Sequence, residues 1–128
     1  MLDKRIEELI QLPIQNSEEL QILNYRVGGE YKTHYDFFPP NLAGSAAHIT
    51  RGQRVARLIL YLNDVEEGGE AIFLEIGLKI IPKAGNALCV AYMNSSGQPD
   101  PLTLHAGCPI LKSEKWIATR WVRERGYK

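Results

Sequence analysis

Hydrophobic and polar residues alternate over several short stretches of this chain. The clearest stretch is 54–63, where leucines at every second position share one face and Arg57, Ile59 and Tyr61 share the other. This two-residue period is typical of a β-strand. Shorter stretches of the same kind, separated by glycine and proline, predict further strands at 20–27, 31–37, 71–74, 79–82, 87–92, 102–105 and 115–122. Many short strands predict a mainly β fold with two antiparallel sheets.

One segment near the start has the period of a helix instead. In residues 3–12, Ile6, Leu9 and Ile10 form a stripe with charged residues opposite, and Pro13 ends the pattern. We therefore expect a short N-terminal amphipathic helix before the strands.

Length and composition narrow the class of protein. With 128 residues, 1–128 should form a single domain. Its 15 basic and 15 acidic residues balance, which argues against a general nucleic-acid binder. The apolar runs are too short to cross a membrane, and the start of the chain does not resemble a signal peptide. Cys89 and Cys108 are too few for a disulfide framework, so we expect a reducing, cytoplasmic location.

His34 and Asp36 are the first candidates for chemistry. Two residues apart on an extended strand, they place an imidazole and a carboxylate on the same face. A distant third ligand would complete the two-histidine, one-carboxylate triad of non-haem iron sites. His105 is the best candidate, because the only other histidine, His48, lies in a polar loop predicted over 39–53. Ten residues after His105, Lys115 offers a cation suited to a carboxylate-bearing co-substrate.

Three blocks of sequence surround these residues. They are YRVGGEYKTHYD at 25–36, GQRVARLILYLNDVEEGGE at 52–70 and DPLTLHAGCPILKSEKWIATRW at 100–121. In that order they closely resemble the catalytic domain of the prolyl 4-hydroxylases, which are Fe(II)- and 2-oxoglutarate-dependent oxygenases. The resemblance runs from about residue 2 to 123. It implies a double-stranded β-helix, which is a jelly-roll or cupin-like fold.

The resemblance also implies a role for each matching residue. His34, Asp36 and His105 would bind Fe(II), and Lys115 would bind the distal carboxylate of 2-oxoglutarate. Tyr25 and Tyr61 match tyrosines that hydrogen-bond this co-substrate, and Arg54 and Trp121 match positions that face the peptide. The implied reaction hydroxylates a prolyl residue of a peptide or protein while 2-oxoglutarate is decarboxylated to succinate, and ascorbate dependence would be inherited.

The chain departs from the family pattern at several points. Ala71 replaces a threonine after Gly-Gly-Glu, Arg57 stands where a small residue is usual, and Leu74 replaces a proline. A second cation near Lys115 could strengthen carboxylate binding or block the pocket. Similar domains usually carry supporting elements before this region, so we expect the given sequence to be a fragment, a truncated homologue, or a chain whose exposed strand edge is covered by a partner, for example in a homodimer.

Three alternatives stay open at this point. The chain could hydroxylate another substrate by the same chemistry, or it could be a metal- or peptide-binding module without turnover. A zinc hydrolase would also use histidine and aspartate, but it would want a general base, and no helical His-Glu-x-x-His pattern is present.

Overall fold

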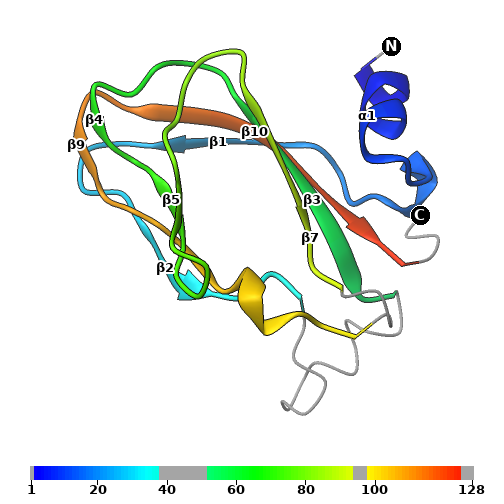
Figure 1. Ribbon diagram of the computed structural model, residues 1–128. Coiled ribbons are helices and arrows are strands. Elements are labelled where there is room, and N and C mark those ends of the chain that lie inside the picture. Colours follow the sequence, from blue (N-terminus) through cyan, green and yellow to red (C-terminus); the bar gives the residue numbers. More distant parts are fainter. Residues whose placement is uncertain (1, 38–51, 94–97, 125–128) are drawn as a thin grey trace.

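Two facing β-sheets form the body of the protein in a computed structural model that describes residues 2–37, 52–93 and 98–124 (Figure 1). The larger sheet has the order β1-β10-β3-β7, and every neighbouring pair in it is antiparallel. Its strands are β1 (Gln21–Tyr25), β3 (Arg54–Tyr61), β7 (Ala87–Ala91) and β10 (Lys115–Arg123). The two longest strands, β3 and β10, therefore lie at its centre.

The smaller sheet has the order β2-β8-β5-β6 and is also antiparallel. Its strands are β2 (Tyr31–His34), β5 (Ala71–Phe73), β6 (Leu78–Ile80) and β8 (His105–Gly107). A separate pair, β4 (Glu67–Gly68) with β9 (Ile110–Lys112), lies at one end of the two sheets (Figure 1).

The helical elements are few. Helix α1 (Leu2–Ile10) buries Ile6 and lies outside the space between the sheets (Figure 1). The chain then passes through the 3-10 turn η1 (Ile14–Asn16), and a second 3-10 turn, η2 (Pro101–Thr103), leads into β8. No helix in the described part of the chain is long and apolar enough to span a membrane.

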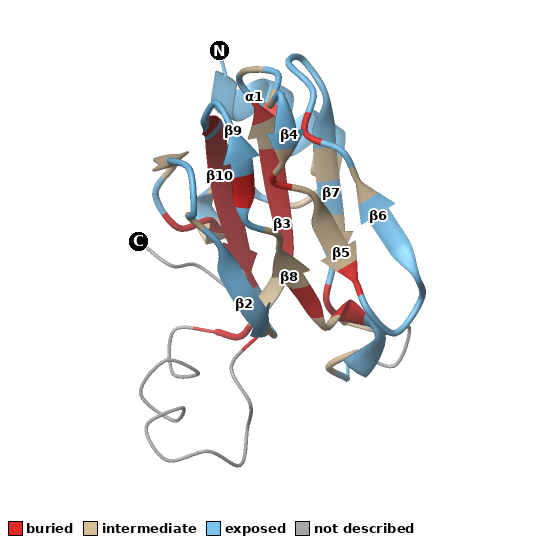
Figure 2. Cartoon of the chain, turned by 90° about the vertical axis from the view of Figure 1, so that its left-hand side faces the viewer, coloured by how far each residue is buried: buried red, intermediate tan, exposed pale blue. Residues whose placement is uncertain are grey.

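Buried side chains concentrate on β3 and β10, while β2 and β6 are largely exposed (Figure 2). Two clusters of buried hydrophobic residues are present, and each includes at least one residue of the larger sheet. One cluster contains Ile59, Tyr61 and Ile117, and the other contains Phe37, Tyr92 and Trp121. The second cluster lies at the end of the sheets where the polar side chains described below converge.

The predicted fold class is confirmed: the protein is mainly β, with antiparallel sheets and one short N-terminal helix. The strand predicted at 102–105 is wrong, because 101–103 is a 3-10 turn and β8 begins only at His105. The strand predicted at 31–37 ends at His34. The sequence pattern also missed the short strands β4 and β9. Most of the predicted loop 39–53, including His48, lies outside the described residues.

Candidate metal centre

The smaller sheet brings His34 and His105 side by side. The two residues are paired across β2 and β8, and their ring centroids are 4.4 Å apart. Asp36 lies two residues beyond the end of β2, and its Oδ1 is 3.0 Å from Nε2 of His34 and 3.5 Å from Nε2 of His105. One ligand atom from each of the three residues lies within 4.8 Å of the others. The predicted triad therefore converges on one point within reach of a single ion.

Backbone carbonyls fix the orientation of both imidazoles. Nδ1 of His34 lies 2.6 Å from the carbonyl oxygen of Lys32, and Nδ1 of His105 lies 2.8 Å from that of Thr103. A carbonyl oxygen can only accept a hydrogen bond, so each Nδ1 carries the proton. Each Nε2 faces Asp36, and the lone pair of this nitrogen is the one that would bind a metal ion. This is the arrangement that holds histidine ligands in place around a metal ion.

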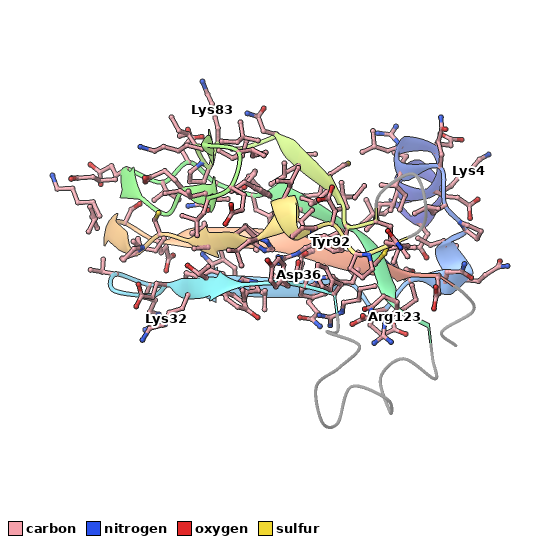
Figure 3. The ribbon with its side chains drawn as sticks, turned by 60° about the horizontal axis from the view of Figure 1, so that its bottom comes forward. Lys4, Lys32, Asp36, Lys83, Tyr92 and Arg123 are labelled. Carbon is pink, nitrogen blue, oxygen red and sulfur yellow. The ribbon has the colours of Figure 1, made fainter. Side chains whose placement is uncertain are left out.

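Asp36 is 4% exposed, and its second oxygen is held by three donors. Oδ2 accepts hydrogen bonds from the Trp121 indole N–H at 3.1 Å and from the Tyr92 hydroxyl, and Nη1 of Arg57 approaches it at 3.4 Å. Asp36 and Tyr92 lie next to each other in the interior (Figure 3). Because Oδ2 is engaged on this side, Oδ1 is the oxygen available to a metal ion.

The surroundings of Asp36 keep it ionised. Burial alone would raise the pKa of this carboxyl, but hydrogen bonds from His105 and His34 and the positive charge of Arg57 hold it well below its usual range. The pKa of Tyr92 is raised well above its ordinary value by burial and by the Asp36 charge, so its hydroxyl remains a neutral donor. The site therefore offers two imidazole nitrogens and one anionic oxygen to a metal ion.

A pocket opens beside this centre, between the two sheets. It encloses about 490 Å³ of empty space including its open mouth. Five of the predicted site residues line it: His34, His105, Lys115, Tyr25 and Tyr61. Arg57, Ile59 and Ile117 also line this pocket, so its wall carries two cations and an apolar stretch, with Glu30 as its carboxylate.

Lys115 lies on the pocket wall at the start of β10 and is only 8% exposed. Its ammonium donates to the carbonyl oxygen of Gly69 at 3.0 Å and lies 4.9 Å from the centre of the Tyr25 ring. Burial lowers the pKa of Lys115, and the nearby charge of Arg57 lowers it further. An anionic ligand would bind favourably to this ammonium, since a partner of opposite charge offsets the free-energy cost of burying it.

Tyr25 and Tyr61 face the same pocket from β1 and β3. Burial raises the pKa of both phenols, although the charge of Arg57 acts in the opposite direction. Both side chains therefore stay neutral and present hydroxyl groups to the pocket.

Arg54 and Trp121, predicted to face a peptide, lie next to each other, and Trp121 contacts the proposed metal ligand Asp36. Trp121 is 6% exposed, and its indole N–H is held by Asp36. The guanidinium groups of Arg54 and Arg57 each lie 4.3 Å from the centre of the Trp121 ring. Arg54 also donates to both carboxylate oxygens of Glu18, at 2.7 and 3.0 Å. A role for this pair in peptide binding stays a prediction.

Two tyrosines of the site were not found from the sequence. Tyr31 is 44% exposed and stacks on His34, with ring centroids 3.8 Å apart. An irregularity in the pairing of β2 with β8 separates these two residues, so the two-residue period gives no sign of the contact. Tyr92 donates to Asp36 from 56 residues away in the sequence. This contact becomes visible only once the two sheets face each other in the folded chain.

The other departures from the family pattern fall in different places. Ala71 lines the pocket, where its methyl group leaves no hydroxyl for a ligand. Leu74 is exposed, outside the pocket-lining residues. Of the two, only Ala71 stands where it changes the site.

Comparison with known proteins agrees with this geometry. The family model described as "2OG-Fe(II) oxygenase superfamily" matches residues 20–123. The chain is 38% identical over 125 residues to human prolyl 4-hydroxylase subunit alpha-1, covering 98% of this chain and 23% of that protein. It is 36% identical over 148 residues to the probable prolyl 4-hydroxylase 10 of Arabidopsis thaliana, covering 99% of this chain and 49% of the relative. The chain thus spans less than half the length of these curated relatives.

A solved structure is similar in both fold and sequence. The viral collagen prolyl hydroxylase of Paramecium bursaria Chlorella virus-1, in a 2OG complex, superposes with a TM-score of 0.78 and 30% identity over 95% of this chain and 70% of that one. The resemblance inferred from the three sequence blocks is confirmed. The chain therefore belongs to the 2OG-Fe(II) oxygenase superfamily.

Proposed function

We propose that this chain is the catalytic domain of an Fe(II)- and 2-oxoglutarate-dependent dioxygenase that hydroxylates a prolyl residue of a peptide or protein. The observation that carries the proposal is the convergence of His34, Asp36 and His105 beside a pocket that contains Lys115. One cluster of residues offers the metal ligands, and an adjacent cation suits an acidic co-substrate.

The donor set fits a ferrous ion. Two Nε2 atoms and one carboxylate oxygen are the ligands of the two-histidine, one-carboxylate triad, which leaves further metal positions open. When bound, iron supplies the redox chemistry with dioxygen. In the overall reaction, a substrate C–H bond, dioxygen and 2-oxoglutarate give an alcohol, succinate and carbon dioxide. The protein's own contribution is to fix the ligands through the Lys32 and Thr103 carbonyls and to hold Asp36 ionised.

The pocket suits 2-oxoglutarate as the co-substrate. Lys115 provides a buried positive charge for the distal carboxylate, and Tyr25 and Tyr61 provide hydroxyl donors on the same wall. Ile59 and Ile117 give the methylene carbons an apolar surface. Fe(II) and 2-oxoglutarate are the cofactor and co-substrate in the family's name, whereas the need for ascorbate stays a prediction.

The relatives support a proline-containing peptide as the substrate class, because they are prolyl 4-hydroxylases and a collagen prolyl hydroxylase. Tyr31 adds a feature of this chain. Its ring is partly exposed at the pocket and stacked on a proposed metal ligand. An aromatic face in that position suits the flat, apolar ring of a prolyl residue. The homodimer and the cytoplasmic location also remain proposals.

A second candidate is a module that binds a metal and a peptide without turnover. Arg57 and Ala71 both line the pocket, and either could weaken productive binding of the co-substrate. A hydroxylase of the same superfamily with a different substrate would keep the chemistry and change only the peptide.

The test is an anaerobic titration of Fe(II) and 2-oxoglutarate into the metal-free protein, followed in the visible metal-to-ligand charge-transfer band. Air and a proline-rich, collagen-like peptide are then added, and succinate and peptide mass are measured. We expect the band, succinate formation and the gain of one oxygen atom by the peptide. His34→Ala should lose all three, whereas Lys83→Gln, which changes an exposed side chain outside the pocket, should keep them.

The outcomes separate the candidates. A band without succinate favours the binding module. Succinate without peptide oxidation favours another substrate, and a folded protein without a band refutes the metal and co-substrate site.

A further inference from the structure

Arg57 is a buried cation with hydrogen-bonding capacity left over. Nε donates to Thr119 Oγ1 at 2.7 Å, and Nη1 approaches Asp36 Oδ2 at 3.4 Å, which is long for a hydrogen bond. Among the described residues, no acceptor pairs with Nη2. The side chain is 5% exposed, yet it lines the pocket. A buried guanidinium with unused donors is a ready site for a carboxylate.

The strand register gives the position of Arg57 along the pocket. On β10, every second residue from Lys115 to Trp121 faces inward, and Trp121 pairs with Arg57 on β3. Lys115 therefore lies at one end of this row, and Arg57 enters at the other end, beside Thr119 and the metal centre. Between them, Ile117 and Ile59 form the wall. The order along the pocket is cation, apolar wall, cation.

This order matches a short chain with a carboxylate at each end. Lys115 and Arg57 are close enough for the guanidinium to lower the pKa of the ammonium. Two like charges lining one pocket repel each other until an anion enters. Asp36 forms an ion pair with Arg57, whereas Lys115 forms none with a carboxylate among the described residues. Glu30 also lines the pocket, so the placement of one cation at each end, rather than an excess of positive charge, suits a diacid.

We infer that Arg57 binds the C1 carboxylate of the 2-oxo acid at the metal end of the pocket, while Lys115 binds the distal carboxylate. The inference rests on the proposed function and adds a binding residue to it. It also assigns the two cations different tasks. Arg57 binds the C1 carboxylate, which all 2-oxo acids share, and Lys115 binds the distal carboxylate, which only a diacid has.

A purely structural role for Arg57 makes a different prediction. The guanidinium also lies over Trp121 and beside Asp36, so its removal could act only through the metal ligand. In that case the affinity for the metal would fall, and the affinity of the metal-loaded protein for 2-oxo acids would not. Binding of both must therefore be measured.

The experiment is calorimetric titration of protein saturated with Mn(II), which replaces iron without turnover. Two probes are used: 2-oxoglutarate, and 2-oxovalerate, which has the same chain length but no distal carboxylate. Arg57→Gln should weaken both probes by about the same factor, on the order of tenfold or more, as expected for loss of a charge-assisted hydrogen bond. Lys115→Met should weaken 2-oxoglutarate alone.

Two further variants serve as controls. Arg57→Lys keeps the charge and loses the planar fork, so its affinity for both probes should lie between those of the wild type and Arg57→Gln. If Arg57→Gln does not fold, the affinities of Arg57→Lys for the two probes provide the test. Lys83→Gln removes an exposed charge outside the pocket-lining residues and should leave both affinities unchanged.

Unchanged affinities in the Arg57 variants at saturating Mn(II) would overturn the inference and leave the proposed function intact. Selective loss of 2-oxoglutarate alone in Arg57→Gln would also overturn it, because Arg57 would then serve the distal carboxylate. A wild-type protein that binds Mn(II) but no 2-oxoglutarate would refute the proposed function itself, and the inference with it.

Discussion

Replacing Lys115 with methionine should make the protein more stable without ligand and less stable with it. The ammonium is buried on the pocket wall, where it donates one hydrogen bond to a backbone carbonyl and lies over one aromatic ring. In the described part of the chain, no carboxylate forms an ion pair with it. Methionine has a similar length and no charge to desolvate. We expect Lys115→Met to raise the free energy of unfolding by about 1 kcal/mol and Tm by about 4 °C.

Binding of 2-oxoglutarate should reverse the ranking of the wild type and Lys115→Met by stability. At a concentration one hundred times its Kd, 2-oxoglutarate should stabilise the wild type by about 2.7 kcal/mol. The variant lacks the distal anchor, so it should gain much less. The two proteins should therefore exchange rank when 2-oxoglutarate is added, and this exchange cannot arise from a general change in packing.

The pH dependence gives a second signature. Because the pKa of Lys115 is lowered in the folded protein, the unfolded chain binds more protons between that lowered value and the ordinary lysine pKa. The stability of the wild type should rise with pH across this alkaline window. The variant should lack this contribution to the slope.

The assay is thermal unfolding of Mn(II)-loaded protein with and without 2-oxoglutarate. The matched control is Lys79→Met, which changes an exposed lysine 3.6 Å from Glu70 and should alter stability by less than about 1 kcal/mol. A Lys115→Met protein that melts below the wild type without ligand would refute the reasoning. Equal stabilisation of both proteins by 2-oxoglutarate would also refute it.

Two further predictions concern the fold. The pKa of Glu18 is lowered despite its burial, because Arg54 and Arg123 hydrogen-bond to it and attract its charge; Glu18→Gln should cost about 3 kcal/mol at neutral pH. Urea unfolding should show this difference shrinking as the pH falls below the ordinary glutamate pKa and through the lowered pKa of folded Glu18, where the wild type loses the same contribution; a constant difference would contradict the reading. Gly68→Ala should cost more than about 2 kcal/mol, because φ is +85° and the new Cβ would lie 2.3 Å from the carbonyl oxygen that precedes β9. Gly77→Ala has a similar φ of +65° and open space, so about 1 kcal/mol is expected there, and equal losses in urea unfolding would count against the steric argument.

Local alternation predicted the parts of the site that depend on one strand. The period of 54–63 places Arg57, Ile59 and Tyr61 on one face, and all three line the pocket. The spacing of His34 and Asp36 predicted a shared face, and the two side chains do meet, although β2 ends before Asp36. Such features follow from backbone geometry over a few residues, which is why a sequence reveals them.

Contacts between distant strands could not be predicted in the same way. Trp121 reaches Asp36 across 85 positions of sequence, from β10 of the larger sheet to the segment that follows β2 of the smaller sheet. By contrast, the 3-10 turn at 101–103 left a signal that was missed: Asp100 caps it by accepting from the Leu102 N–H, and a proline follows the cap. An aspartate followed by proline is a common start of a helical turn.

The contact between Trp121 and Asp36 has a practical consequence, because it gives the protein an internal optical reporter. The chain has two tryptophans. Trp116 is 39% exposed, whereas Trp121 is 6% exposed and hydrogen-bonded to the carboxylate proposed to hold the metal. The emission of Trp121 should therefore lie at shorter wavelength than that of Trp116, and a paramagnetic ion bound at Asp36 should quench it selectively. Arrival of the ion can then be timed in a stopped-flow fluorimeter without any added dye.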